Sequence, residues 1–239
     1  MIHRNSHAAL DLDTRVLKAK KIEALLGLPE QSSRLRLLEI GTGSGVIAHY
    51  FATNASLKFD VSAVDVCDHR IVRDGFEFLQ VQSTQLPYCD ASFDVVISNH
   101  VIEHVGDLSS QSHHLQEIRR VLRPDGVGYL AVPNRWMLVE PHYQLALLSW
   151  LPRSLRTPYL RLAGKGQVYD CEPLQSGQLE RMLQSSGLEF QHMGFEAAKA
   201  LQEIEGQAAR LIRALEGIPL WTRAAIKPLL PTLVYLVRR

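Results

Sequence analysis

Residues 37–45 of the chain read LLEIGTGSG, an apolar stretch that runs straight into three glycines at alternate positions. Glycine lets a backbone turn sharply and approach a ligand closely, because it has no Cβ. A strand that passes through a glycine loop into a helix is where doubly wound α/β proteins bind nucleotide-like cofactors. The dinucleotide fingerprint is G-x-G-x-x-G, and here Val46 stands where that fingerprint needs its last glycine. The loop therefore predicts a nucleoside-type cofactor other than a dinucleotide.

Around this loop, apolar runs alternate with helical patterns, which indicates βαβ units and a parallel, doubly wound sheet. Strands are expected at residues 35–40, 59–65, 76–82, 93–98, 127–132, 188–194 and in the final PTLVYLVRR segment, and helices at 14–27, 44–53, 111–123, 174–186 and 196–215. Residues 134–173 are rich in Pro, Trp, Tyr and Arg and lack a clean period, so they are expected to form a cap or insertion. We therefore predict one domain over residues 1–239, with an N-terminal helix at 14–27, a cofactor-binding core at 35–133, the cap at 134–173 and completion of the sheet at 174–239.

The composition limits the classes of partner. The chain has 239 residues, is 46% hydrophobic and carries a net charge of +1, so no strong field would attract nucleic acid. Cys67, Cys89 and Cys171 are widely spaced, form no metal-ligand pair or disulfide framework in the sequence, and fit a reducing cytosol. No signal peptide or membrane-spanning run is evident, so we expect a cytoplasmic protein.

Asp65 follows Gly45 by 20 residues and ends the strand predicted at 59–65. In doubly wound folds an acid at this place accepts hydrogen bonds from ribose hydroxyls, and a carboxylate has acceptor sites for both. The alternative is a surface acid beside a glycine turn. The loop and the acid together favour nucleoside binding.

Several segments resemble one family in the same order along the chain. The loop LLEIGTGSG is similar to the E-x-G-x-G-x-G motif of class I S-adenosylmethionine-dependent methyltransferases. Residues 85–94 (QLPYCDASFD), 98–104 (SNHVIEH) and 117–126 (EIRRVLRPDG) resemble that family's LPF-x-D-x-SFD, EH and E-x-x-RVL-(K/R)PGG segments. The resemblance covers residues 35–133. It implies a seven-stranded, mostly parallel Rossmann-like sheet with its last strand antiparallel, and S-adenosylmethionine as cofactor.

The resemblance also implies which residues hold this cofactor. Glu39 and the glycine loop would hold its methionine end, and Asp65 its ribose. Gln82 stands where the family often has an acid, and its amide oxygen can still accept from the adenine amino group. The implied cofactor-binding residues are Glu39, Gly41, Thr42, Gly43, Gly45, Asp65, Val66, Gln82, Ser83, Thr84, Asn99 and His100.

Methyl transfer from a sulfonium needs little covalent help, so the protein's task is to align nucleophile, methyl and sulfur. An oxygen nucleophile must also lose its proton, and histidine is the usual acceptor near neutral pH. The candidates are His142, His104 and His100, each of which has a packing or capping role as its alternative. The spacing His100-x-x-Glu103-His104 resembles the E-x-x-E-H of quinone-ring O-methyltransferases, thought to bind a divalent cation, but a histidine replaces the first acid. We therefore predict no metal site.

The cap and the tail leave alternatives open. Trp and Leu in the cap could grip an apolar acceptor or only cover the sheet. Arg153, Arg156, Arg161 and Lys165 could bind an anionic group or face water. Residues 218–239 alternate apolar blocks with basic residues, which fits peripheral contact with a membrane, or, the interpretation we favour, a helix and an edge strand.

These observations predict an enzyme that transfers a methyl group from S-adenosylmethionine to a small-molecule, lipid or glycan-type acceptor at oxygen, resembling the quinone and lipid O-methyltransferase branch. The alternative is a non-catalytic S-adenosylmethionine-binding regulatory module. Nucleic acid is not expected as a partner, since no Asn/Asp-Pro-Pro-(Tyr/Phe) segment follows the strand at 93–98. The sequence names neither the acceptor nor the oligomeric state.

Overall fold

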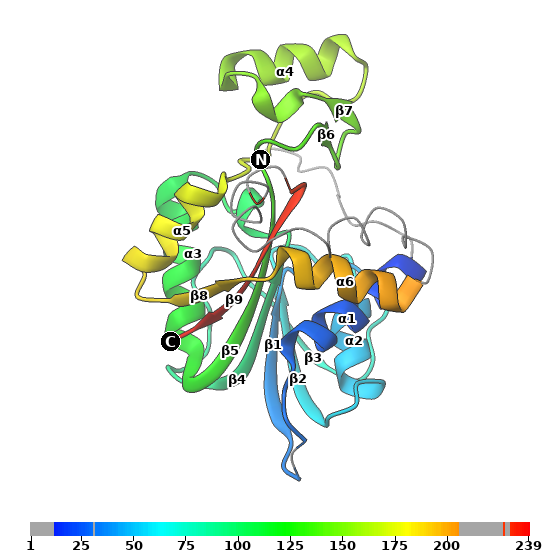
Figure 1. The fold of residues 1–239 in the computed structure, drawn as a ribbon, viewed down its shortest axis with the longest axis vertical. Helices are drawn as coiled ribbons and strands as arrows, with labels where there is room; N and C mark the ends of the chain where they lie inside the picture. Colours follow the sequence, from blue (N-terminus) through cyan, green and yellow to red (C-terminus); the bar gives the residue numbers. More distant parts are fainter. Residues whose placement is uncertain (1–11, 31, 206–226, 228–229) are drawn as a thin grey trace.

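The computed structural model describes residues 12–30, 32–205, 227 and 230–239. Its centre is a seven-stranded sheet made of β1 (Leu35–Ile40), β2 (Phe59–Asp65), β3 (Glu77–Gln80), β4 (Phe93–Asn99), β5 (Leu122–Pro133), β8 (Glu189–His192) and β9 (Thr232–Arg238). The strand order is β3-β2-β1-β4-β5-β9-β8 (Figure 1). Strands β1 to β5 pair in parallel, and β9 is antiparallel to both of its neighbours. The predicted fold class is therefore confirmed.

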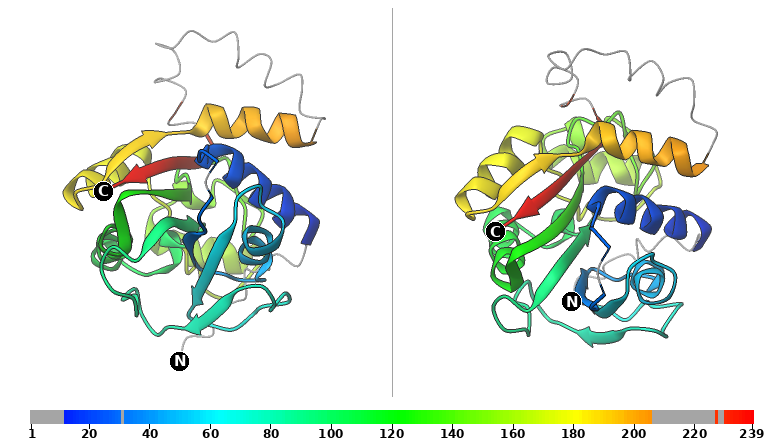
Figure 2. Two further views of the ribbon diagram at one scale, coloured as in Figure 1. Left: turned by 90° about the horizontal axis from the view of Figure 1, so that it is seen from below. Right: turned by 60° about the horizontal axis from the view of Figure 1, so that its bottom comes forward.

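Helices cover both faces of this sheet (Figure 2). They are α1 (Leu12–Leu26), α2 (Val46–Thr53), α3 (Leu108–Val121), α5 (Ser176–Ser185) and α6 (Gly194–Glu205). Side chains of α1, α2 and α6 share one apolar core with the sheet, and side chains of α3 and α5 share the other. The successive β1 residues Leu37 and Leu38 enter opposite cores, as the alternation of a strand requires, and both are fully buried. Burial on both faces explains why these two adjacent residues are both apolar.

Local chemistry sets the helix starts, which differ from the predicted ones. Helix α3 begins at Leu108, earlier than expected, because the Asp107 carboxylate caps it by accepting a hydrogen bond from the Ser110 N–H at 2.9 Å. Helix α2 begins at Val46 because Gly45 has a left-handed conformation and cannot continue a right-handed helix. Gly45 and Asp107 thus fix where the chain turns from the sheet into α2 and α3.

The end of the chain also differs from prediction. The last strand, β9, lies between β5 and β8 and is not an edge strand, and residues 233–237 are buried. The segment proposed as a membrane-contacting alternative is thus part of the sheet from Thr232 to Arg238, and its residues 218–226 lie outside the described residues. Positions 206–215 of the predicted last helix lie outside them too. Among the residues that are described, no helix is long and apolar enough to span a bilayer.

Other boundaries shift without changing the topology. Strand β5 starts at Leu122, so the helix predicted to residue 123 ends earlier. Residues 124–126, expected between a helix and a strand, lie inside the span of β5, where the pairing with β4 shifts register between Phe93 and Val95. Strands β3 and β8 are shorter than predicted.

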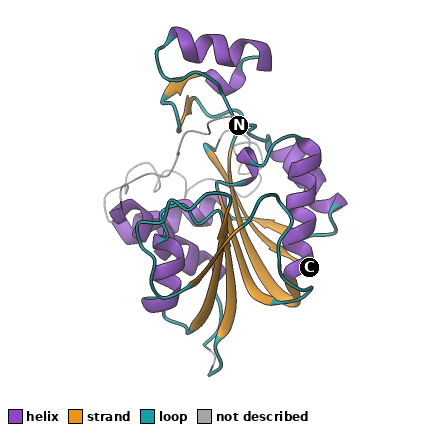
Figure 3. Cartoon of the chain, turned by 180° about the vertical axis from the view of Figure 1, so that it is seen from behind, coloured by secondary structure: helices purple, strands orange, loops and turns teal. Residues whose placement is uncertain are grey.

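The segment between β5 and α5 builds a small cap outside the sheet. It contains β6 (Val139–Glu140), β7 (Leu145–Ala146), a 3-10 turn η2 (Leu148–Trp150) and α4 (Arg153–Leu162). Figures 1 and 3 show these elements standing beyond one end of the sheet, the end at which β5 finishes. A bridge between Asn134 and Leu174 joins the two segments that enter and leave the cap. The cap has its own apolar cluster of Tyr143, Leu145, Leu148, Leu160 and Cys171.

Candidate active site

The glycine loop between β1 and α2 forms one wall of the candidate site. Gly41, Gly43 and Gly45 all have positive φ, between 55° and 83°. A Cβ on Gly41 would collide with Val101, and a Cβ on Gly45 would collide with the backbone oxygen of Val72. These two glycines are therefore needed for close packing. At Gly43 the nearest atom to an added Cβ would be 4.0 Å away, so its backbone is open to a ligand.

Asp65 lies at the carboxyl end of β2 and ties that strand to the loop. Its Oδ2 accepts a hydrogen bond from the Gly43 N–H at 2.9 Å, and its Oδ1 accepts one from the Cys67 N–H at 3.3 Å. An ionised carboxylate has about four acceptor sites, so two remain for a ligand. The structure thus gives Asp65 a role in shaping the loop, and its contact with ribose hydroxyls stays a prediction.

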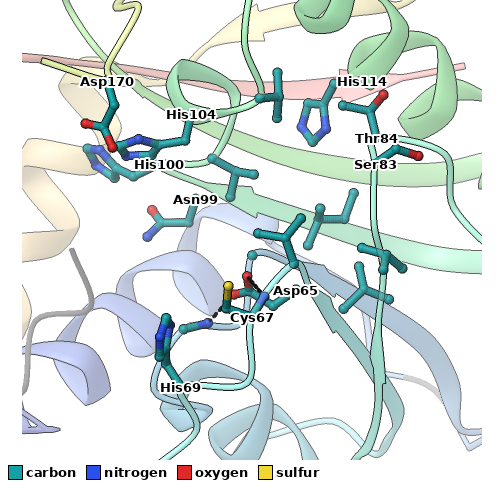
Figure 4. A pocket seen from close by; sticks show the side chains of 18 of the residues that line it. Asp65, Cys67, His69, Ser83, Thr84, Asn99, His100, His104, His114 and Asp170 are labelled. Atoms are coloured by element: carbon teal, nitrogen blue, oxygen red, sulfur yellow. Dashed lines mark hydrogen bonds between the residues drawn. The ribbon is translucent and has the colours of Figure 1, made fainter. Parts of the chain in front are cut away.

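A cavity of about 630 Å³ opens between the loop and the cap (Figure 4). This volume lies in the range of about 300–1,000 Å³ that is usual for small-molecule sites. Its wall comes from α1, from the ends of β1, β2 and β4, from the loop after β3, and from the cap. Most of the predicted site residues line it: Gly41, Gly43, Asp65, Val66, Gln82, Ser83, Thr84, Asn99, His100, His104 and His142.

Three predicted cofactor contacts lie behind the cavity wall. Glu39 is buried in β1, and its carboxylate accepts a hydrogen bond from the Ala48 N–H at 3.1 Å. Burial raises the pKa of Glu39 to about 8, although the charge of Arg15 opposes the shift. Thr42 is buried, and Gly45 packs against Val72. The structure therefore gives these residues a role in shaping the loop, and their contact with a cofactor stays a prediction.

The sequence interpretation missed the contribution of α1. Arg15 and Lys18 line the cavity. The Arg15 Nε is buried and has no hydrogen-bond partner among the described residues, and the Arg15 Nη2 is the atom nearest to a Cβ built on Gly43. Burial lowers the pKa of Arg15, and Glu39 opposes that shift. The two basic residues are three positions apart and so share a face of the helix, which was the available signal.

The three candidate histidines reach the cavity from different segments, and Figure 4 shows His100 and His104 at one end of it. His100 follows β4 with a φ of 59°, a conformation that is rare outside glycine. His104 ends a 3-10 turn, η1 (Ile102–His104), and His142 belongs to the cap. The Nε2 atoms of His104 and His142 are 3.4 Å apart. His104 and His142 thus form a facing pair, and His100 is not part of it.

Buried carboxylates surround these histidines. Glu140 Oε1 lies 2.7 Å from His142 Nδ1; burial lowers the pKa of His142, but this hydrogen bond raises it above its ordinary value. Glu103 is fully buried, with Oε1 at 3.5 Å from His100 Nδ1 and 3.9 Å from His104 Nε2. Burial raises the pKa of Glu103, but the two histidines bring it below its ordinary value.

Cys171 joins this group from the segment that leaves the cap. It is buried, and its Sγ is 3.7 Å from His104 Nδ1 and 3.9 Å from His142 Nδ1. Burial and the nearby carboxylates raise the pKa of the Cys171 thiol. The spacing in the sequence did not predict this contact, because Cys171 is far from both histidines along the chain. The folding of the cap places it beside them.

The basic residues of the cap are mostly engaged within it. Arg156 is buried and pairs with Glu172 at 3.2 Å, and Arg153 pairs with the same carboxylate at 2.6 Å. The Arg161 Nε donates to the Gln167 carbonyl oxygen at 2.6 Å. The structure therefore explains Arg156 by a structural role and not by binding of an anionic acceptor.

Comparison with known proteins agrees with this geometry. Residues 38–130 match a family model described as a methyltransferase domain. A Mycobacterium tuberculosis protein named "Probable S-adenosylmethionine-dependent methyltransferase" is 37% identical over 103 residues, which cover 41% of this chain and 36% of that protein. A "Ubiquinone biosynthesis O-methyltransferase" of Sinorhizobium fredii is 26% identical over 170 residues, 67% of this chain and 62% of its own length. The chain thus spans about a third of the first relative and under two thirds of the second.

Solved structures share the whole fold at low sequence identity. An S-adenosylmethionine-dependent methyltransferase from Mesorhizobium loti has a TM-score of 0.59 with 16% identity, covering 93% of this chain and 100% of that one. The 1,6-didemethyltoxoflavin-N1-methyltransferase of Burkholderia thailandensis has a TM-score of 0.53 with 17% identity, covering 98% and 83%. Residues 38–130 thus match a methyltransferase domain, and the chain shares the fold of these solved methyltransferases.

Proposed function

We propose that the protein is an enzyme that transfers a methyl group from S-adenosylmethionine to an oxygen of a small-molecule, lipid or glycan-type acceptor. The observation that carries this proposal is a single cavity lined by Gly43, Asp65 and His100, in which Figure 4 shows Asp65 and His100 well apart. When bound, S-adenosylmethionine supplies an electrophilic methyl group on a sulfonium. The protein's residues bind the two reactants, align them and accept a proton.

The loop end of the cavity fits the cofactor. Arg15 would bind the methionine carboxylate, because a guanidinium recognises that group, and the absence of a side chain at Gly43 leaves room for it. Asp65 would accept hydrogen bonds from the ribose hydroxyls with its two remaining acceptor sites. Val66 and Gln82, also on the wall, would contact the adenine. The buried Arg15 Nε, which lacks a partner among the described residues, supports this fit.

His100 is the histidine that we propose as the proton acceptor. Its Nδ1 faces the buried Glu103 carboxylate at 3.5 Å, which holds the ring and leaves Nε2 for the acceptor hydroxyl. The left-handed backbone at His100 is a strained conformation of the type that gathers at functional sites. Asn99, the last residue of β4, lines the cavity beside it and would help to position the reactants.

The cap carries an exposed apolar patch outside the residues that line the cavity. Trp136, Leu138, Leu147 and Trp150 are all exposed. They are contiguous, since the Leu147 N–H donates to the Leu138 carbonyl at 2.7 Å and the two Trp rings meet edge to face at 5.4 Å. Exposed apolar patches of this kind mark sites that bind lipid-like or protein partners. The relative named for ubiquinone biosynthesis also supports the proposal of an apolar acceptor.

Methyl transfer from labelled S-adenosylmethionine to a panel of catechols, hydroquinones and hydroxylated lipids tests the proposal. We expect label in at least one apolar hydroxylated acceptor and an O-methyl product by mass spectrometry. Binding of the cofactor without transfer to any acceptor would favour the non-catalytic module. Transfer to nitrogen or carbon would overturn the choice of oxygen.

A further inference from the structure

His104, His142 and Cys171, here named the His–Cys cluster, meet at the cap end of the cavity. One ligand atom from each lies within 4.8 Å of the others. The residues come from η1, from the loop between β6 and β7, and from the segment that leaves the cap. His104 and His142 also line the cavity, while Cys171 lies behind them. The proposed methyl transfer assigns no task to these three side chains.

The distances in the cluster are close to those of a metal centre. Bonds of about 2.0–2.1 Å from zinc to imidazole nitrogen and about 2.3 Å to sulfur place tetrahedral ligand atoms about 3.3–3.6 Å apart. The two Nε2 atoms are 3.4 Å apart, and the sulfur lies 3.7 Å from the nearest histidine nitrogen. Since the sulfur approaches the Nδ1 atoms of both histidines, binding through both Nε2 atoms requires the Cys171 or His104 side chain to rotate.

A second observation is the negative charge gathered around the cluster. Glu103 is fully buried; its Oε1 lies 3.5 Å from His100 Nδ1 and 3.9 Å from His104 Nε2, but neither carboxylate oxygen accepts a hydrogen bond within the described residues. Glu140 is also buried and accepts from the Tyr143 N–H beside its contact with His142, and Asp170 Oδ1 lies 3.7 Å from the Cys171 sulfur. Buried carboxylates cost several kcal/mol unless a cation compensates them. A bound divalent cation would supply that compensation.

We propose that the His–Cys cluster binds a divalent cation of the zinc type, with His104, His142 and Cys171 as its three protein ligands. Imidazole and thiolate ligands select zinc over magnesium or calcium, which prefer oxygen. Glu140 would orient His142 by accepting a hydrogen bond from Nδ1–H, which leaves Nε2 for the ion. The Cys171 sulfur binds as thiolate, so its proton passes to the buffer as the metal–sulfur bond forms.

Three protein ligands leave a fourth position, which is the pattern of catalytic zinc sites. Because His104 and His142 line the cavity, this position opens toward it. It would bind an oxygen of the acceptor and lower the pKa of that group, with His100 outside the ligand set and able to take the proton. This consequence rests on the proposed methyl transfer, whereas binding of the cation does not.

Metal titration of the full chain tests the site without any turnover. After treatment with a chelator, the wild-type protein should bind about one equivalent of Zn²⁺ per chain. The Co²⁺-loaded protein should show a thiolate-to-cobalt charge-transfer band. Cys171→Ser should lose this band and weaken zinc binding at least about 10-fold, while Cys89→Ser, at an exposed thiol, should keep both. Glu140→Gln should weaken zinc binding about 10–100-fold.

Two control measurements separate loss of the metal site from loss of the fold. Thermal unfolding and S-adenosylhomocysteine affinity report whether each variant folds, so a failure of the proposed methyl transfer is seen separately from a failure of the metal site. If Cys171→Ser does not fold, His142→Gln takes its place and should also weaken zinc binding. Wild-type protein that takes up no stoichiometric zinc, or a folded Cys171→Ser variant that binds zinc as tightly with an unchanged cobalt spectrum, would overturn the proposal.

Discussion

The Asp65 carboxylate accepts a hydrogen bond from the Gly43 N–H at 2.9 Å, and this contact joins the end of β2 to the glycine loop. Asp65→Asn removes the charge that strengthens hydrogen bonds to ribose hydroxyls, which are worth about 1.5–3 kcal/mol to a charged acceptor. We expect a loss of about 10–100-fold in S-adenosylhomocysteine affinity by calorimetry. Asp60→Asn, on the same strand but exposed and paired with Arg34, is the control and should bind normally. Equal affinities in the two variants would contradict the role of Asp65.

Arg15 tests recognition of the methionine end. Arg15→Met keeps the apolar stem and removes the guanidinium that lines the cavity over Gly43. The affinity for S-adenosylhomocysteine should fall about 10-fold or more, while the affinity for methylthioadenosine, which has no carboxylate, should change little. The measurement is calorimetry with both ligands. A parallel loss for the two ligands would assign Arg15 to the fold of α1 and not to the carboxylate.

The buried Glu39 carboxyl should make the free energy of unfolding depend on pH. Its pKa is raised by burial to about 8 in the folded protein, whereas an unfolded chain has it near its ordinary value of 4.5. The stability of wild type relative to Glu39→Gln should therefore be greatest at low pH. It should fall as the pH rises from about 4.5 to about 8, by at most about 1.4 kcal/mol per pH unit.

Denaturant unfolding of both proteins across this pH window, without ligand, measures the difference for Glu39. Taking the difference cancels the titration of other groups. A difference that stays flat, or that grows in favour of wild type at high pH, would show that Glu39 is ionised when buried, paired with Arg15.

His100→Gln should lower kcat by about 10²–10⁴-fold with little change in S-adenosylhomocysteine affinity, because the proposed proton acceptor acts on the acceptor hydroxyl. His49→Gln, on the exposed face of α2 and hydrogen-bonded to the Asp74 carbonyl oxygen, is the control and should be fully active. Full activity of His100→Gln would show that His100 is not the proton acceptor.

Much of the fold was predictable because the sheet is buried on both faces. Strands β1 and β2 have the predicted bounds, since both are rich in buried apolar residues and glycine or Asp marks their ends. The order of β8 and β9 was harder to predict. The final segment reads as an edge strand, and only the pairing of β8 with its outer side makes it internal.

The part of the site at the strand ends was predictable from the sequence. The part that depends on the fold of the cap was not. Gly43, Asp65 and Asn99 end or follow strands that are neighbours in the sheet, so their convergence follows from its parallel topology. Cys171 approaches His104 only because the cap returns through the bridge between Asn134 and Leu174. No local pattern encodes that contact, which is why the cysteine was read as having no partner.

Binding of S-adenosylhomocysteine to the full chain is the most direct test of the central claim. Calorimetry with S-adenosylhomocysteine and, in parallel, with NAD compares the two cofactor classes that a glycine loop of this kind can serve. The account predicts about one equivalent of S-adenosylhomocysteine bound per chain, with an affinity between about 1 μM and 1 mM, and no binding of NAD. Absence of S-adenosylhomocysteine binding at about millimolar ligand, or preferential binding of NAD, would contradict it.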